Sequence, residues 1–202
     1  MPGTLDIAGF AAAVLLIELT PGPNMAWLAG LAATEGRRSG LAAVAGIALG
    51  LLTNGILAAL GLATLLKAMP ALLDGLRIAG AAMMVWLAIE AWRGADKAPP
   101  PTATKRAFAT GALINLLNPK AYMFFVVVAP EFLGGRTLGR SEALTLAVVS
   151  TGIATAIHLA IVLAGARAQG WLANPARTKW VRRGFAVVML GVAASFLAIK
   201  AG

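Results

Sequence analysis

The sequence contains no cysteine and a single histidine, and only 12% of its 202 residues are charged. A chain without cysteine forms no disulfide and no thiolate metal site, and one histidine disfavours a carrier of transition metals. The motifs His-Glu-x-x-His and Gly-x-Ser-x-Gly are also missing, so neither a zinc peptidase site nor a serine hydrolase site can be assembled. We therefore expect no catalytic residues, no bound metal and no cofactor.

Apolar residues, in contrast, make up 59% of the chain, and the mean hydropathy of +0.83 is far above that of soluble domains. Residues 41–66 form a run without a single charge. Crossing a bilayer takes roughly 20 apolar residues, so this run is long enough to span one. The sequence predicts an all-α integral membrane protein whose main surroundings are the lipid bilayer.

Six apolar runs are separated by clusters of charge. They are Leu5–Thr34, Leu41–Leu66, Leu72–Trp92, Ala107–Pro130, Ala143–Ala166 and Gly184–Ile199. The hydrophilic linker 93–106, with three consecutive prolines, divides the chain into halves 1–92 and 107–202. We expect one transmembrane domain, residues 1–202, of about six helices in two halves of three.

The net charge of +9 comes from basic residues in short clusters between the apolar runs, which favours a role in topology over binding to nucleic acid. Eleven Lys and Arg follow the first, third and fifth runs, and five lie on the other side. Since cytoplasmic loops are enriched in basic residues, this count predicts that both termini are periplasmic.

The first run of each half is interrupted by proline. In residues 5–34 the interruption is Thr20-Pro21-Gly22-Pro23-Asn24, and in residues 107–130 it is Asn115-Leu116-Leu117-Asn118-Pro119-Lys120. A proline removes the helical partner of the carbonyl four residues back, here those of Ile17, Leu19 and Asn115. Within hydrocarbon these carbonyls must face protein, water or a ligand. Interruptions at matching positions of two halves are typical of a transporter's midplane site and suggest an inverted repeat.

Charges at the interruptions make this hypothesis more specific, because Glu18 and Lys120 both lie near the middle of their runs. We expect an amino-acid zwitterion to place its carboxylate at Lys120 and the amides after Pro23, and its ammonium at Glu18. The alternative is an ion pair between Glu18 and Lys120 that only holds the halves together. The candidate substrate-binding residues are Glu18, Pro21, Gly22, Pro23, Asn24, Asn54, Asn115, Asn118, Pro119 and Lys120.

Three other polar positions favour structural roles. Asn54 shares a face with Gly46 and Gly50, so an interhelical hydrogen bond is favoured over a contact with the ligand. His158 is expected to pack within its helix bundle rather than to relay protons. Glu90 adjoins Trp92 and is expected to anchor a helix end at the membrane interface.

The run Leu19-Thr20-Pro21-Gly22-Pro23-Asn24, followed by Gly36-Arg37-Arg38, resembles the signature of the LysE/RhtB translocators, and 115–121 with Phe124-Phe125 resembles their second motif. The resemblance implies a bacterial inner-membrane exporter of amino acids or related metabolites, driven by the proton-motive force, with protons as coupling ion. The Pro-Gly-Pro-Asn form is closer to the RhtB branch, associated with homoserine and threonine. A channel or a non-transporting scaffold remains as an alternative, an intramembrane enzyme is a weaker one, and the oligomeric state is left open.

Overall fold

The computed structural model describes residues 4–20, 22–94, 103–134, 138–168 and 170–198, and within these ranges the chain forms helices joined by turns, without a strand. The short segments η1 and η2 are a π-helix and a 3₁₀-helix, and η3 is a further 3₁₀ turn. The elements are α1 (Ile7–Leu19), α2 (Pro23–Glu35), α3 (Arg37–Ala59), α4 (Leu62–Ala68), α5 (Pro70–Arg93), α6 (Ala103–Leu116), α7 (Pro119–Met123), η1 (Phe124–Val128), η2 (Ala129–Phe132), α8 (Arg140–Arg167), η3 (Trp171–Ala173) and α9 (Pro175–Ala198).

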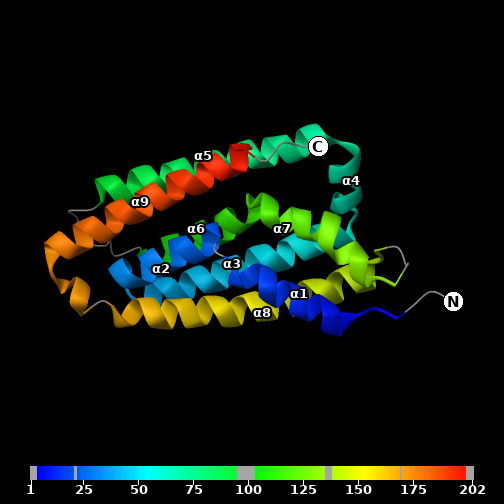
Figure 1. The fold of residues 1–202 in the computed structure, drawn as a ribbon, viewed down its shortest axis with the longest axis horizontal. Coiled ribbons are helices and arrows are strands. Elements are labelled where there is room, and N and C mark those ends of the chain that lie inside the picture. The colour runs from blue at the N-terminus through cyan, green and yellow to red at the C-terminus, as the bar shows by residue number, and fades with distance from the viewer. Residues whose placement is uncertain (1–3, 21, 95–102, 135–137, 169, 199–202) are drawn as a thin grey trace.

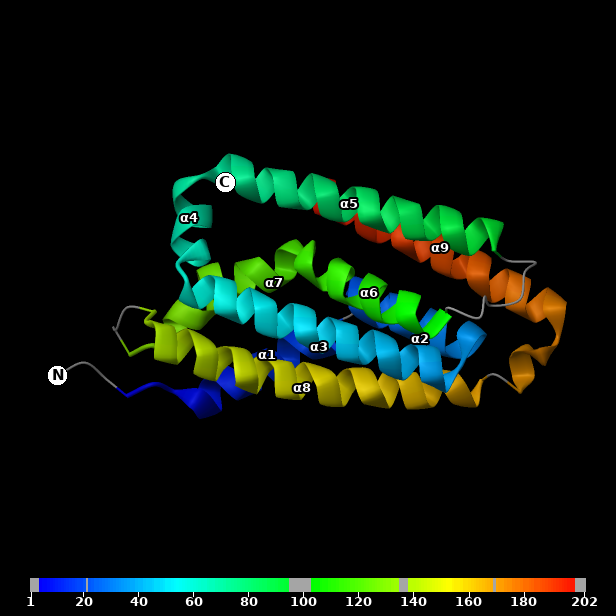
Figure 2. The ribbon, with the colours of Figure 1, turned by 180° about the vertical axis from the view of Figure 1, so that it is seen from behind.

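The chain runs back and forth along one axis (Figures 1 and 2). α1 and α2 lead from one end of the molecule to the other, α3 returns, α4 crosses that end, and α5 leads back. α6, α7, η1 and η2 follow one another in the same direction as α3, and α8 and α9 complete the path. The all-α prediction is confirmed for the described residues.

The helices α3, α5, α8 and α9 are each long and apolar enough to cross a membrane. α1 and α2, bent by 56° at their junction, meet the same test as a pair, which gives four or five candidate spans in the described part of the chain. The chain is therefore a multi-pass membrane protein. The fourth predicted span corresponds to α6, α7, η1 and η2 together, so the count of six stays a prediction.

Two predicted spans have different bounds in the structure. The second was expected to reach Leu66, but α3 ends at Ala59 because Gly61 adopts a left-handed backbone (φ 95°), after which α4 turns across the bundle. The sixth was expected to begin at Gly184, but α9 already begins at Pro175 and is 24 residues long. Its first turns carry the basic residues that the sequence suggested to be loop.

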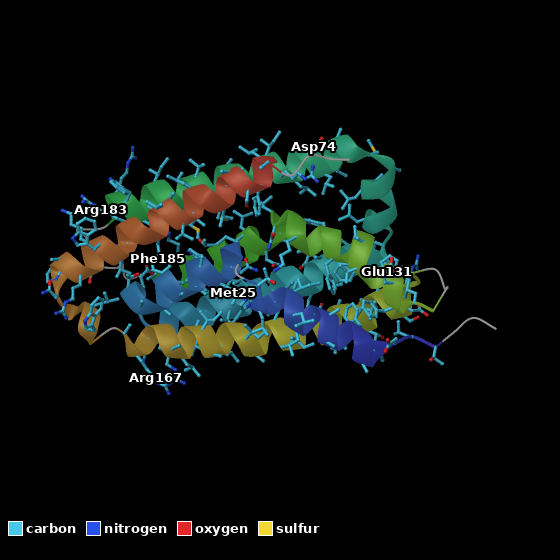
Figure 3. The ribbon with its side chains drawn as sticks, in the orientation of Figure 1. Met25, Asp74, Glu131, Arg167, Arg183 and Phe185 are labelled. Carbon is cyan, nitrogen blue, oxygen red and sulfur yellow. The ribbon has the colours of Figure 1, made fainter. Side chains whose placement is uncertain are left out.

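Charge is distributed unequally between the two ends. One end of the molecule holds the junction of α2 with α3, the last turns of α5 and α8, and the first turns of α6 and α9. We call it the basic end. Figure 3 shows Arg167 and Arg183 there and Asp74 and Glu131 toward the opposite end. Arg77 is buried within α5 and bonded to Asp74 at 2.9 Å.

The bundle consists of two groups of helices. α2, α3, α6 and α8 pack closely around a core that includes Leu28, Ile47 and Val162. α5 and α9 pack along each other and form a second layer, visible above the first in Figure 1. A cluster that includes Met84, Ile114 and Met189 joins this layer to α6 and α2.

Glycines allow α3 and α6 to approach very closely. A Cβ atom at Gly46 would collide with the Phe108 carbonyl of α6, and one at Gly111 would lie 2.5 Å from the Ala43 carbonyl of α3. Close backbone approach through small residues is a common way for membrane helices to associate. The predicted small-residue stripe around Gly46 and Gly50 is confirmed, and it places Asn54 at the interface with α6.

We expect Gly46→Ala to destabilise the fold by about 1–3 kcal/mol, because the atoms it meets are α6 backbone that has no room to shift. Gly152→Ala in α8 is the matched control: nothing lies within 4 Å of its Cβ, and alanine is the better helix former. Thermal unfolding of both variants in detergent checks this. Equal melting temperatures would contradict the close approach of α3 and α6.

Candidate functional site

The interruptions in the two halves lie against each other. The Lys120 ammonium, in the first turn of α7, donates a hydrogen bond of 2.9 Å to the Ile17 carbonyl in the last turn of α1. Ile17 is one of the residues whose carbonyl loses its helical partner to a proline, and the Thr20 amide is its other donor, at 3.2 Å. A charged side chain from one break therefore satisfies the backbone of the other.

The second break follows the same rule with other donors. The Asn115 carbonyl accepts from the Asn118 amide at 3.1 Å and from the Asn54 side chain at 3.3 Å. The Leu116 carbonyl accepts from the Tyr122 hydroxyl at 2.6 Å. The expected interhelical role of Asn54 is confirmed, whereas Tyr122 was not foreseen from the sequence.

Both half-helices after the breaks begin at proline. α2 begins at Pro23 after an extended Gly22, and no side chain caps its first amides. α7 begins at Pro119, and the Asn118 side chain caps it by accepting from the Lys120 amide at 3.0 Å. Proline suits the first turn of a helix because its missing donor has no intrahelical partner there. Pro21 lies outside the described residues.

Buried amide side chains connect the two breaks but leave several polar atoms unused. The Asn24 amide donates to the Asn115 side-chain oxygen at 3.1 Å, and both residues are buried. Within the described residues, the side-chain oxygens of Asn24 and Asn54 and the side-chain nitrogen of Asn115 have no hydrogen-bond partner. Buried polar atoms without partners are rare in proteins, and each calls for an explanation, such as strain, a functional role, or a bound water or ion.

Glu18 approaches His158 rather than Lys120. Its carboxylate lies 3.8 Å from His158 Nε2, and His158 is only 1% exposed. A direct ion pair between Glu18 and Lys120 is not among the contacts of the described residues. His158, expected to serve packing alone, thus faces an acidic side chain.

These groups surround a narrow cavity, which we call the break cavity. Its titratable lining residues are Glu18 of α1, Lys120 of α7 and His158 of α8, and apolar side chains such as Phe124 and Phe125 close it. Of the predicted site residues, the structure brings Glu18, Gly22, Asn24, Asn115, Asn118 and Lys120 to this lining. Asn54 lies behind them, bonded to Asn115.

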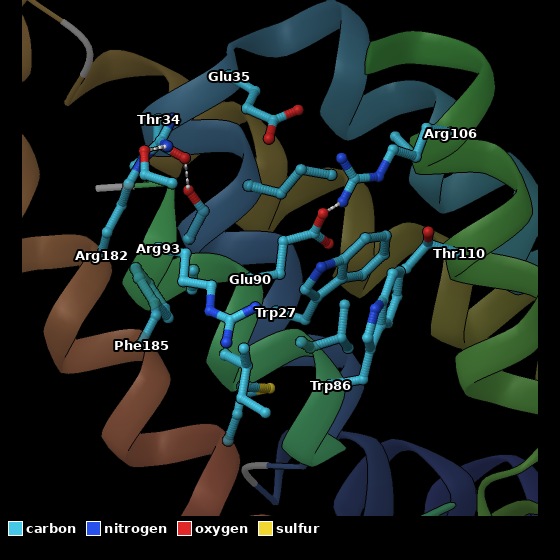
Figure 4. Close-up of a pocket in the computed structure, with 18 of the residues that line it drawn as sticks. Trp27, Thr34, Glu35, Trp86, Glu90, Arg93, Arg106, Thr110, Arg182 and Phe185 are labelled. Carbon is cyan, nitrogen blue, oxygen red and sulfur yellow. Dashed lines mark hydrogen bonds and ion pairs between the residues drawn. The ribbon is translucent and has the colours of Figure 1, made fainter. Parts of the chain in front are cut away.

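A second, larger cavity opens at the basic end between α2, α5, α6 and α9 (Figure 4). It has a volume of about 540 Å³ and is open to solvent, and we call it the open cavity. Glu90 of α5, expected to anchor a helix end, forms an ion pair with Arg106 of α6 on its wall. Its charged and aromatic lining residues, drawn from four helices, are Trp27, Glu35, Trp86, Glu90, Arg93, Arg106, Arg182 and Phe185.

Sequence reasoning did not identify the open cavity, since no short motif contains it. Its residues come from positions 27 to 189 and meet only through the packing of α5 and α9 against the other helices. The break cavity was foreseen because the prolines of the two motifs, Pro21 and Pro23 in the first and Pro119 in the second, produced a local signal. A cavity whose charged and aromatic residues come from distant parts of the chain produces no such local signal.

The chain matches one family of membrane translocators over most of its length. The family model described as "LysE type translocator" matches residues 15–200. The chain belongs to this family. Family membership places it among translocators rather than enzymes, and both proline breaks fall within the matched region.

Individual relatives share much of the length. An uncharacterized membrane protein of Pseudomonas aeruginosa is 32% identical over 84% of this chain and 83% of its own. A homoserine/homoserine lactone efflux protein of Salmonella typhimurium is 26% identical over 89% of both chains. A threonine efflux protein of Escherichia coli K12 is 30% identical over 66% of this chain and 70% of its own. No solved structure matches the chain.

We expect Tyr122→Phe to destabilise this LysE-type translocator by about 0.5–1.5 kcal/mol, since it leaves the Leu116 carbonyl without its hydroxyl donor. The control is Thr53→Val, which removes a 2.8 Å bond to the Leu49 carbonyl in the middle of α3, where the helical bond remains. In detergent, the melting temperature should fall by about 2–4 °C per kcal/mol for Tyr122→Phe and little for Thr53→Val. A larger loss for Thr53→Val would contradict the assignment.

Proposed function

We propose that this protein exports amino acids or related small metabolites across the bacterial inner membrane as a secondary transporter. The observation that carries the proposal is the set of unpartnered buried amide atoms at two facing helix breaks. They offer acceptors for an ammonium group and a donor for a carboxylate, the two groups that all amino acids share. The efflux proteins for homoserine and threonine among the relatives support the same substrate class.

The bound substrate would lie in the break cavity. Its carboxylate would bind Lys120, the first amides of α2 and the Asn115 nitrogen, because a helix N-terminus and a cation both favour an anion. Its ammonium would bind Glu18 and the Asn24 oxygen. Asn118 would keep its present role as cap of α7 and so hold Lys120 in place.

The cavity is narrow, so binding requires the Lys120 ammonium to leave the Ile17 carbonyl. That carbonyl then loses a charged donor, and a substrate ammonium nearby is a suitable replacement. The substrate would therefore exchange partners with the lysine rather than fill a preformed space. Binding of the substrate by Lys120, in the second break, would therefore remove the hydrogen bond that Lys120 donates to the first break.

Coupling to protons would act through Glu18. When a proton from the outside neutralises its carboxylate, the contact with the substrate ammonium weakens and the substrate is released. His158 lies within reach of the same carboxylate at 3.8 Å and would hold Glu18 in position during this step.

The same proposal includes six membrane passes, an inverted repeat and periplasmic termini. The helices that an inverted repeat would make equivalent pack on each other, α3 on α8 and α5 on α9, which is compatible with an internal two-fold axis. The elements α6, α7, η1 and η2 follow one another along the length of the molecule and would together form one bent span. The concentration of basic residues at the end bearing Arg167 and Arg183 supports a cytoplasmic location for that end.

Transport into or out of proteoliposomes tests the function. Vesicles loaded with a panel of neutral, acidic and basic amino acids should lose neutral ones in a saturable way that responds to an imposed pH gradient. A channel would pass current without saturation, and a scaffold would do neither. Flux without saturation, or no flux for any amino acid, would contradict the proposal.

The charges at the breaks provide a separate prediction. Glu18→Gln and Lys120→Met should each lower transport about tenfold or more, because each removes a charged hydrogen bond to the substrate. The double variant should stay inactive although folded. Glu131→Gln, which neutralises an exposed acid far from the cavity, serves as the control and should transport normally.

A purely structural role for the two charges predicts a different pattern. If Glu18 and Lys120 only stabilised each other, the double variant would remove both buried charges and recover much of the activity lost by the single variants. Near-normal export by Glu18→Gln/Lys120→Met would thus assign the pair to the scaffold. Melting temperatures of all four proteins separate loss of folding from loss of transport.

A further inference from the structure

The open cavity at the basic end has no role in the transport step described above. It lies between the two groups of helices, with α2 and α6 on one side and α5 and α9 on the other. The interior of a transporter between two helix groups is the usual place for a substrate to enter. Its position at the basic end puts it on the cytoplasmic side in the proposed topology.

The wall of the cavity is largely aromatic and aliphatic. Trp27 and Leu31 of α2, Trp86 and Leu87 of α5, and Phe185 and Met189 of α9 line it. Trp86 and Phe185 face the space in Figure 4. Such a surface favours an apolar side chain over a charged one.

The charges of the cavity are not all paired. Glu90 is bonded to Arg106, and the Arg182 guanidinium donates to the Gly94 carbonyl. Glu35, at the end of α2, makes no hydrogen bond or close ion pair with another described residue. The guanidinium groups of Arg182 and Arg106 attract its carboxylate from a greater distance, and Figure 4 shows it between them. The Arg93 guanidinium extends toward the middle of the cavity.

A half-buried carboxylate, an arginine and an aromatic wall form a complementary set for one kind of molecule. Glu35 is an acceptor for an ammonium group, Arg93 a donor for a carboxylate, and the indole rings a surface for an aliphatic side chain. Thr110 of α6 adds a hydroxyl that makes no hydrogen bond within the described residues. An amino acid with an apolar side chain carries all the matching groups.

The inner end of the open cavity lies close to the break. Trp27 is three residues after Asn24 on α2, less than one helical turn of about 5.4 Å. Buried Ile114, next to Asn115 on α6, belongs to an apolar cluster that also includes the lining residues Leu87 and Met189 of the open cavity. Movement of α5 and α9 away from α6 would open this cluster and connect the two cavities.

We propose that the open cavity is a cytoplasmic loading site, where an amino acid with an apolar side chain binds through Glu35 and Arg93 before it reaches the break. The proposal rests on the proposed export function and names its substrate class and first binding step. The ion pair between Glu90 and Arg106 joins α5 to α6 across the mouth and keeps the wall in place until the substrate is bound.

Equilibrium binding of radiolabelled L-leucine to the purified full-length protein in detergent tests the site. Glu35→Gln should weaken binding about 10- to 100-fold, because it removes one charged hydrogen bond. Glu35→Asp should retain most of the affinity, and Glu131→Gln should bind as the unchanged protein does. Unlabelled L-leucine should displace the label at lower concentration than L-serine.

Lys120→Met separates this site from the break. It should still bind L-leucine at the loading site while it fails to export it from proteoliposomes. Normal binding by Glu35→Gln, together with loss of binding by Lys120→Met, would show that leucine binds only at the break and would overturn the loading site. If the unchanged protein neither transports nor binds any amino acid, the proposed function itself fails.

An unchanged KM for export in Glu35→Gln also overturns the loading site, because a first binding step through that carboxylate must affect KM. Melting temperatures show whether each variant is folded. Glu35→Gln keeps the size of the side chain and removes its charge, whereas Glu35→Asp keeps the charge on a side chain one methylene shorter. Together the two variants separate the effect of the charge from that of the shape, and Glu35→Asp still reports on the site if Glu35→Gln unfolds. Equal loss of affinity in both would assign Glu35 to packing.

Discussion

A backbone carbonyl in hydrocarbon has to find a donor, and much of this structure follows from that requirement. Proline frees the carbonyls of Ile17 and Asn115 at the two breaks, and the donors that replace the lost amides come from distant parts of the chain. Lys120 reaches back to α1, and Asn54 reaches from α3 to α6. For Asn54 to do so, α3 and α6 must lie nearly in contact, which the glycines of α3 allow.

The same requirement places the polar groups that a ligand needs. Amide side chains brought together to serve the breaks leave some of their own atoms unused, as Asn24 and Asn115 do. A site formed in this way is polar in an otherwise apolar bundle, and it lies where two half-helices end or begin. The helix breaks and the binding groups are therefore products of one arrangement rather than separate features.

Much of this was predictable where the physical cause was local. Apolar runs gave the helices α5 and α8 to within a few residues, and the prolines located both breaks. The partners of the freed carbonyls were harder to predict. The Tyr122 hydroxyl reaches the Leu116 carbonyl only because α7 begins at Pro119, and the sequence alone does not show this. The bounds of α9 were wrong because its basic first turns read as loop, and Gly61 ended α3 earlier than hydropathy indicated.

Non-local contacts were beyond the reach of sequence patterns. His158 was expected to pack, but whether it meets Glu18 depends on how α1 packs against α8. Glu90 was expected at a membrane surface, and its pairing with Arg106 depends on where α6 begins after the linker. A charged residue near a helix end can lie at the membrane surface or pair with another helix, and the packing of the helices decides between the two.

α1 is attached at both of its ends to the second half of the chain. At its start, the Asp6 amide donates to the Phe132 carbonyl at 3.0 Å, and near its finish the Ile17 carbonyl accepts from Lys120. A helix clamped at two points behaves as a strut: it transmits displacement along its length and resists bending between the clamps. Both attachments are hydrogen bonds, but the first joins two backbone groups, whereas the second depends on one long lysine side chain. The end of α1 beside the bend to α2 is therefore held in place by a single flexible side chain from the second half of the chain.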